Sequence, residues 1–203
     1  NQGITRRGSY AAYIDISHPE IEEFINMRKT TGGDLNRKCL NLHNAVNITN
    51  AFLEAVAADD EWRLIDPKTK TAVKIVSARD LWFQIIQTRV ETGEPYIVNI
   101  DTCNEALPEE QKKLGLEIKQ SNLCSEITLP TNEDRTAVCC LSSVNLEYYD
   151  TWSVEDNFIS DLVTMLDNVL DSFIFSVSDN KGYDKAAYSA MRERSIGLGA
   201  MGF

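Results

Sequence analysis

Three side chains that could act together on a substrate lie at alternate positions between residues 120 and 130. They are Asn122, Cys124 and Glu126. The β-branched residues that follow favour an extended backbone, in which alternate side chains leave the same face. An amide can donate and accept hydrogen bonds, a thiol can carry a nucleophile or a radical, and a carboxylate can act as a general base. The spacing therefore predicts one surface that presents all three groups.

A second apolar segment, at residues 137–146, contains the adjacent cysteines Cys139 and Cys140. A polar, turn-like connection at residues 131–136 precedes it, which predicts that the two segments are neighbours. Adjacent residues of a strand face opposite sides, so only one of these cysteines can share a face with Cys124. Each cysteine taken alone is also compatible with simple packing, because free cysteines are commonly buried.

Three stretches together resemble the large catalytic subunit of ribonucleotide reductase, in its class I or class II form. They are Ser-Asn-Leu-Cys-Ser-Glu-Ile at residues 121–127, Cys-Cys-Leu-Ser-Ser-Val-Asn-Leu at 139–146, and Arg-Ser-Ile-Gly-Leu-Gly-Ala-Met-Gly-Phe at 194–203. The resemblance runs through essentially the whole chain. It implies an α/β fold in which residues 1–203 form one partial domain, a section from the middle of the family's ten-stranded barrel with helices outside.

The resemblance also implies a role for each residue of the motif. Cys124 matches the cysteine that carries the thiyl radical, Glu126 the base that takes the 3'-hydroxyl proton, and Asn122 the amide that bonds the substrate. Leu123 and Ser125 belong to the same substrate-binding segment. The implied activity is the radical reduction of ribonucleoside diphosphates or triphosphates to 2'-deoxyribonucleotides for DNA synthesis.

Two further thiols of the family supply the reducing equivalents and end as a disulfide, and Cys139 matches one of them. Its partner is expected on a strand before residue 1. Leu141 would then point inward beside Cys139, and Cys140 would face the surrounding helices. Because the partner thiol and other parts of the family's site are missing from this section, we expect it to be inactive alone.

The polar start of the chain matches a mobile loop that lies between the specificity effector and the substrate base in the family. Its matching residues are Gln2 and Arg6, and arginine can bond carbonyl or phosphate oxygens bidentately. The resemblance implies no cofactor or metal bound by this section. The radical would come from a metal-containing small subunit in class I or from adenosylcobalamin in class II. Other implied partners are nucleoside triphosphate effectors, a second copy of the full chain, and a thioredoxin- or glutaredoxin-type reductant.

The charge and composition of the chain argue against several classes of protein and site. The formal net charge of −11 argues against a non-specific nucleic-acid surface, which needs clustered lysine and arginine. The sequence contains no run of about 18 apolar residues, which is the length that a membrane-spanning helix needs. Five cysteines form an odd set, and the two histidines do not lie at zinc-ligand spacing. We therefore expect reduced thiols in a cytoplasmic protein.

Helices and strands are expected to alternate around these motifs. Ser17 should cap the first helix, Gly93 should end a helix that buries Leu81, Ile85 and Val90, and His18 should act in capping or packing. The remaining expected elements are strands at residues 9–15, 40–48, 62–65, 71–76 and 96–100, helices at 51–58, 77–90, 158–173 and 183–194, and a mobile, charged connection at 105–119.

The sequence also allows two other functions, and it contains a glycine motif with an alternative interpretation. Cys124 with His43 could form a cysteine-nucleophile hydrolase, which needs the imidazole within reach of the sulfur, although His43 also suits a bonded position at the rim of the core. The five cysteines could instead pack inside a non-catalytic interaction domain. Residues 197–202 fit Gly-x-Gly-x-x-Gly, a dinucleotide fingerprint only between a strand and a helix; the resemblance implies close packing of a barrel segment instead.

Overall fold

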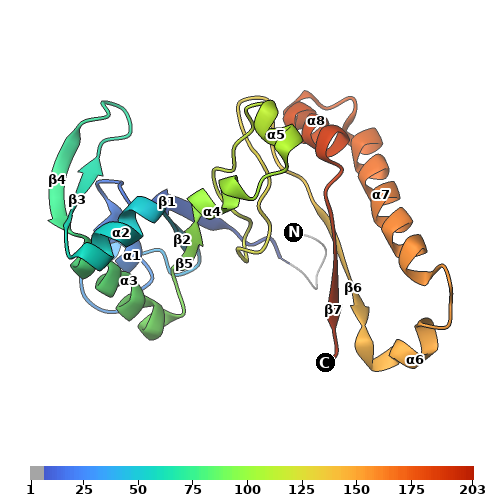
Figure 1. The fold of residues 1–203 in the computed structure, drawn as a ribbon, viewed down its shortest axis with the longest axis horizontal. Coiled ribbons are helices and arrows are strands. Elements are labelled where there is room, and N and C mark those ends of the chain that lie inside the picture. The colour runs from blue at the N-terminus through green and yellow to red at the C-terminus, as the bar shows by residue number, and fades with distance from the viewer. Residues whose placement is uncertain (1–6) are drawn as a thin grey trace. The chain divides into compact units, whose positions relative to one another are not determined.

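The computed structural model describes residues 7–203, which fall into two compact units, one ending at Leu129 and the other comprising Pro130–Phe203 (Figure 1). Helices and strands alternate along both, which confirms the predicted α/β class. The strands form one sheet of three and two sheets of two. Within residues 7–203, none of these sheets closes on itself.

The first unit is built on a parallel sheet in the order β1-β2-β5. Its strands are β1 (Ala11–Asp15), β2 (His43–Ile48) and β5 (Tyr96–Asn99). Five of the six residues of the central strand β2 are buried, and its register pairs Ile14 with Val46. A strand buried on both faces is typical of parallel sheets covered on each side.

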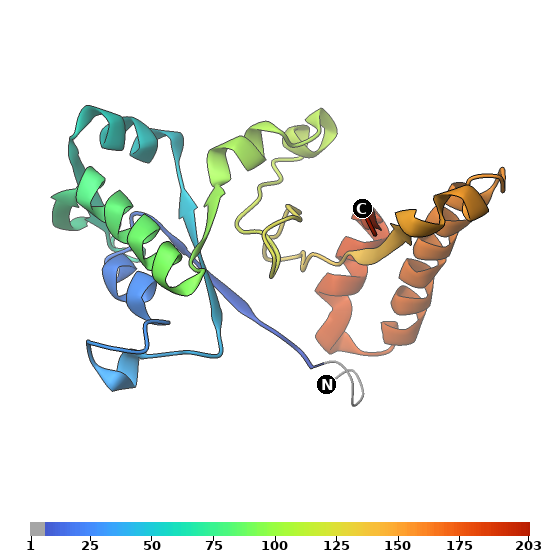
Figure 2. The ribbon, with the colours of Figure 1, turned by 90° about the horizontal axis from the view of Figure 1, so that it is seen from below.

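Three helices lie on one side of this sheet: α1 (Ile21–Asn26), α2 (Asn50–Ala58) and α3 (Ala78–Thr92) (Figure 2). A short 3-10 helix, η1 (Leu35–Arg37), follows α1. The apolar core forms between the helices and the sheet, and Phe52 is fully buried there with its ring edge-on to Trp62 at 5.1 Å. The other buried members of this core are Ile16, Ile21, Ile25, Val46, Ile48, Leu64, Ala78, Leu81 and Ile85.

Local sequence signals set most helix ends correctly. The Thr49 hydroxyl accepts a hydrogen bond from the N–H of Phe52 at 3.1 Å, the Ser77 hydroxyl accepts one from the N–H of Asp80, and Gly93 ends α3 with a φ of 82°. The exception is α1. It begins at Ile21 with Glu20 at the capping position, so the capping role predicted for Ser17 is wrong.

Two side chains near these helices test finer predictions. The His18 ring accepts a hydrogen bond from the N–H of Glu20 at 3.1 Å, as its expected local role requires. Val90 is 82% exposed, so its predicted inward position is wrong, whereas Leu81 and Ile85 are buried. Val90 lies nine residues after Leu81, and at about 100° per residue this places it on the opposite face of α3.

A hairpin and two short helices complete the first unit. The strands β3 (Glu61–Ile65) and β4 (Ala72–Ser77) lie where the sequence predicted two short strands, and they pair antiparallel. After β5 come α4 (Ile100–Glu105) and α5 (Glu109–Lys113), where the sequence predicted a mobile connection. Ile118 is 2% exposed, and its backbone N–H and carbonyl both bond the Asn104 side chain. The end of this connection is therefore fixed on α4.

The second unit pairs two parallel strands, β6 (Cys140–Asn145) and β7 (Ile196–Met201). Between them the chain forms η2 (Leu146–Tyr148), α6 (Tyr149–Trp152), α7 (Phe158–Val177), η3 (Lys181–Tyr183) and α8 (Asp184–Glu193). A strand–helix–strand crossover of this kind is what parallel pairing demands. Leu166 and Leu170 are the buried residues of α7, and Arg194 at the end of α8 bonds Asp167 and Asp171 of α7.

The glycines of residues 197–202 lie in β7 and just after it. A Cβ added to Gly197 would approach Leu141 Cδ2 to 2.6 Å, and one added to Gly202 would approach Asn145 Oδ1 to 2.2 Å. Most of the motif lies within the strand β7, whereas a dinucleotide fingerprint forms the turn that follows a strand, so the structure does not support that fingerprint. The glycines instead permit close packing of β7 on β6, as the resemblance implied.

Candidate active site

Residues 121–127, called the Cys124 turn below, form a tight turn in place of the predicted strand. The N–H of Ser125 donates to the carbonyl of Asn122 at 3.3 Å, and Ser125 has a left-handed φ of 67°. The Asn122 Oδ1 accepts hydrogen bonds from the N–H groups of Glu126 and Ile127, both at 3.0 Å. Such side-chain bonding competes with the ladder of a strand. The prediction of one shared strand face is therefore wrong.

The turn nevertheless presents its reactive side chains to solvent. Cys124 and Glu126 are both exposed, and Asn122 is half-buried. Among residues 7–203, neither the Cys124 thiol nor the Glu126 carboxylate has a hydrogen-bonding or ionic partner. Asn122 uses its oxygen to hold the turn, while its Nδ2 donates to no group in the described part of the chain. A thiol, a carboxylate and an amide N–H group are thus available to a ligand.

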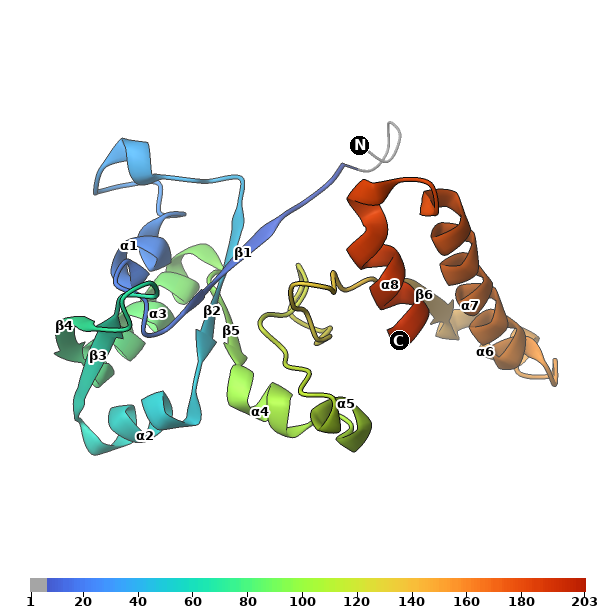
Figure 3. The same ribbon diagram turned by 90° about the horizontal axis from the view of Figure 1, so that it is seen from above.

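The underside of the turn is fixed to the first unit's sheet, on the side opposite α1 and α3 (Figure 3). The Tyr13 hydroxyl on β1 donates to the Asn122 carbonyl at 2.6 Å, and the Asn47 amide on β2 donates to the Lys119 carbonyl at 2.9 Å. Ser121 is 6% exposed and donates to the Ile127 carbonyl.

Sequence reasoning missed these supporting residues. Tyr13 alternates along β1 with Ile14, which packs on the core side, so the period of two would have placed the Tyr13 phenol on the other face.

Cys139 belongs to the second unit, where it lies half-buried directly before β6. Cys140 is the first residue of that strand, and burial raises the pKa of its thiol. Leu141 is 56% exposed and lies against Gly197 of β7. The prediction that Cys139 shares the barrel interior with Cys124, which belongs to the first unit, stays a prediction. The loop residues Gln2 and Arg6 lie outside the described residues.

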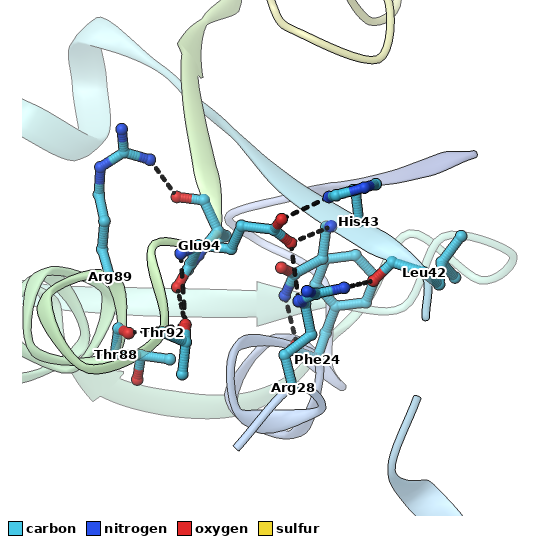
Figure 4. Close-up of polar contacts among 10 residues, drawn as sticks. Phe24, Arg28, Leu42, His43, Thr88, Arg89, Thr92 and Glu94 are labelled. Atoms are coloured by element: carbon cyan, nitrogen blue, oxygen red, sulfur yellow. Dashed lines mark hydrogen bonds and ion pairs between the residues drawn. The ribbon is translucent and has the colours of Figure 1, made fainter. Parts of the chain in front are cut away.

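His43, the base of the hydrolase hypothesis, belongs to a separate set of polar residues (Figure 4). Its Nδ1 lies 2.5 Å from Oε1 of Glu94, whose Oε2 accepts from Arg28 Nε at 3.0 Å and from the Asn44 N–H at 3.1 Å. Arg28 also donates to the Leu42 carbonyl. We call these five residues the Glu94 cluster. Its central carboxylate is 8% exposed, and it bonds His43 into the rim of the core as the sequence predicted.

Within residues 7–203, none of the five cysteines forms a disulfide. Cys39 is exposed, whereas Cys103 is half-buried on α4, where burial raises its pKa. Over residues 7–203 no group of three or more histidine, cysteine, aspartate or glutamate side chains could hold a metal ion. Across the same residues, no helix combines the length and apolar character that crossing a bilayer requires.

Comparison with known proteins identifies the class. The family model described as "Ribonucleotide reductase, barrel domain" matches residues 1–203, the full sequence. The chain therefore belongs to the ribonucleotide reductase family, and its residues match the family's barrel domain.

Individual relatives support this membership. The chain is 55% identical over 203 residues to a ribonucleoside-diphosphate reductase large-subunit homologue of Frog virus 3, covering 100% of the chain and 36% of that protein. It is 45% identical to the large subunit of Invertebrate iridescent virus 3, covering 100% of the chain and 40% of the relative. The chain thus spans well under half the length of these relatives.

A solved structure has the same fold. The class Id ribonucleotide reductase alpha subunit of Actinobacillus ureae superimposes with a TM-score of 0.79 at 33% identity, over 96% of this chain and 34% of that subunit. The two chains therefore share both the family and the arrangement of elements.

Proposed function

We propose that this chain is part of the catalytic subunit of a ribonucleoside-diphosphate reductase, and that the Cys124 turn is its reaction site. The observation that carries the proposal is the turn itself, which leaves an exposed thiol, an exposed carboxylate and a half-buried amide NH2 group without partners among the described residues. The turn occurs in a chain whose relatives carry the name ribonucleoside-diphosphate reductase. Those names support a diphosphate as the substrate.

The reaction needs these groups because hydroxide is a poor leaving group from an unactivated 2'-carbon. A thiyl radical at Cys124 removes the 3'-hydrogen, and the sulfur becomes a thiol. Glu126 takes the proton of the 3'-hydroxyl, which allows the 2'-oxygen to leave as water. Two thiols supply two electrons and two protons and become a disulfide; one of these protons leaves with the 2'-oxygen as water and the other ends on the 2'-carbon. Glu126 then returns its proton to the 3'-oxygen, and Cys124 returns the hydrogen atom to the 3'-carbon, which restores the thiyl radical. We assign one of those two thiols to Cys139.

The geometry supports different roles for the oxygen and the nitrogen of the Asn122 side chain. Its oxygen is occupied by the N–H groups of Glu126 and Ile127, so only its Nδ2 is left to bond a substrate oxygen. Leu123 and Ser125 line the same turn. Leu141, exposed within the second unit, is proposed to meet the substrate beside Cys139.

The remaining parts of the system are proposed from the family. Relatedness to a class Id subunit favours a class I system, in which a separate radical-generating subunit supplies the radical and this chain binds no cofactor. We further propose a homodimer of the full-length protein in the cytoplasm, re-reduction by a thioredoxin- or glutaredoxin-type protein, and nucleoside triphosphate effectors. Their signal would reach the substrate through Gln2 and Arg6.

The test replaces one group at a time in the full-length protein. Cys124→Ser, Glu126→Gln and Cys139→Ser should each abolish deoxynucleotide formation while leaving the circular dichroism spectrum unchanged. Cys39→Ser is the matched control, because Cys39 is an exposed free thiol outside the turn, and it should keep full turnover. Reductase activity in Cys124→Ser would refute the proposal.

The two alternative functions have less support. A hydrolase needs the His43 imidazole at the sulfur, but the described hydrogen bond of that ring goes to Glu94. An interaction domain would not need an exposed motif thiol, because packing cysteines are buried. Ester or amide hydrolysis that His43→Ala alone removed would favour the hydrolase.

A further inference from the structure

The inference concerns Tyr13 on β1, whose hydroxyl bonds two residues of the Cys124 turn, Asn122 and Ser125, on either side of Cys124 in the sequence. Its hydroxyl oxygen lies 2.6 Å from the Asn122 carbonyl oxygen and 3.0 Å from Ser125 Oγ. Cys124 lies between these two attachment points in the sequence. We propose that Tyr13 is a positioning residue that fixes the thiol and the neighbouring carboxylate for reaction, which rests on the function proposed above.

The direction of each hydrogen bond follows from the chemistry of the groups. A carbonyl oxygen can only accept, so the single phenolic proton of Tyr13 is directed to Asn122. At the second contact the phenolic oxygen must therefore accept, and the Ser125 hydroxyl donates. One oxygen atom thus connects Asn122 and Ser125, which are the first and last residues of the β-turn 122–125 within the Cys124 turn.

The other described hydrogen bonds of the turn join its own residues to one another. Within the described chain, the Cys124 side chain makes no hydrogen bond of its own. Ser125 stands in a left-handed conformation that is unfavourable for a residue with a side chain. The Asn122 side chain holds the end of the turn at Glu126 and Ile127, and Tyr13 is the link from the turn to the sheet beneath.

The position of Tyr13 predicts a larger effect on kcat than on KM. Tyr13 is half-buried under the turn, so its hydroxyl is engaged with the backbone and does not face a ligand. Small displacements of a reacting group lower the rate steeply, whereas binding draws on contacts along the whole substrate. Loss of the hydroxyl should therefore lower kcat and leave KM nearly unchanged.

The experiment compares Tyr13→Phe with Tyr10→Phe in the full-length protein. Tyr10 is 76% exposed and lies directly before β1, so its variant should match the wild type. Tyr13→Phe should lower kcat roughly tenfold and change KM less than about threefold. It should also accelerate amide hydrogen exchange in residues 122–127 by roughly three- to tenfold, because one hydrogen bond to the turn is lost.

Each other outcome overturns the inference. Unchanged kcat in Tyr13→Phe, or a lower kcat with unchanged exchange in the turn, would contradict positioning by this hydroxyl. Ser125→Ala removes only the weaker contact and should cost less than Tyr13→Phe; a larger loss would contradict the assigned hydrogen bonds. Cys124→Ser is measured in parallel. If that variant stays active, the proposed function fails, whereas if only Tyr13→Phe behaves as wild type, this inference alone fails.

Discussion

The Glu94 cluster and the Cys124 turn are both polar, and they differ in how many of their groups have partners. In the cluster, both carboxylate oxygens of Glu94 are bonded, and the carboxylate is 8% exposed. In the turn, the Glu126 carboxylate is exposed and has no partner within residues 7–203. The Glu94 carboxylate stabilises the fold, because both of its oxygens already have partners. The turn keeps groups free for a ligand.

The largest expected effect comes from breaking the cluster. Glu94→Ala leaves Arg28 and His43 without their anion and leaves the Asn44 N–H unbonded, which should lower the local stability of β2 and β5 by about 3 kcal/mol. Amide hydrogen exchange of these strands in the full-length protein measures this as exchange accelerated about 100-fold.

The control for this variant lies three residues earlier. Glu91 pairs with Lys29, but its side chain is 45% exposed, so Glu91→Ala should hardly change exchange in the same strands. Equal effects of Glu91→Ala and Glu94→Ala would contradict the difference between a buried and an exposed carboxylate.

The second prediction separates the role of the Asn122 side-chain oxygen from the role of its NH2 group. Asn122→Asp keeps the oxygen that accepts from Glu126 and Ile127 but lacks the amide N–H group, so the turn should persist while turnover falls roughly tenfold or more. Asn122→Ala removes both the oxygen and the NH2 group. Exchange of the two turn amides should be slow in the aspartate variant and faster by about one order of magnitude in the alanine variant.

Turnover at the wild-type level in Asn122→Asp would show that the N–H group is not used. Fast exchange in that variant would instead show that the turn depends on more than the acceptor oxygen. These results distinguish a failed ligand role from a failed structural role.

Local signals explain which elements could be predicted. Thr49, Ser77 and Gly93 act through hydrogen bonds or backbone angles within a few residues, so their helix ends were readable from the sequence. The same holds for the hairpin of β3 and β4.

The Glu94 cluster was not readable, because His43 and Glu94 are 51 residues apart and no local pattern links them.

The Cys124 turn shows a different kind of failure. Alternating residue types at 122, 124 and 126 fit a strand, but the Asn122 side chain replaces the strand's hydrogen bonds with its own. The site residues could be named from the motif, whereas their conformation and the support from Tyr13 depended on tertiary contacts. Similarly, the glycines at 197–202 were recognisable, but pairing with β6 decided that they form a strand.

The smallest effect tests the same capping chemistry at two sites. In the loop between β3 and β4, the Asp66 carboxylate accepts from the N–H groups of Lys68 and Thr69, both at 2.8 Å. The bonds from Thr69 and then Lys68 lower the Asp66 pKa below its ordinary value of 3.8. The resulting stabilisation is present above that value and is lost as pH falls through the lower pKa of the folded state.

At Asn122, a neutral amide oxygen likewise accepts hydrogen bonds from two backbone N–H groups, and this oxygen does not titrate. Acidification below about pH 4 should therefore speed amide exchange in the Asp66 loop, beyond the intrinsic effect of pH, and leave the amide of Ile127 protected. Asp66→Asn should remove the acid sensitivity of the loop, because the amide oxygen still accepts both bonds. Persisting acid sensitivity in Asp66→Asn would mean that another group controls the loop.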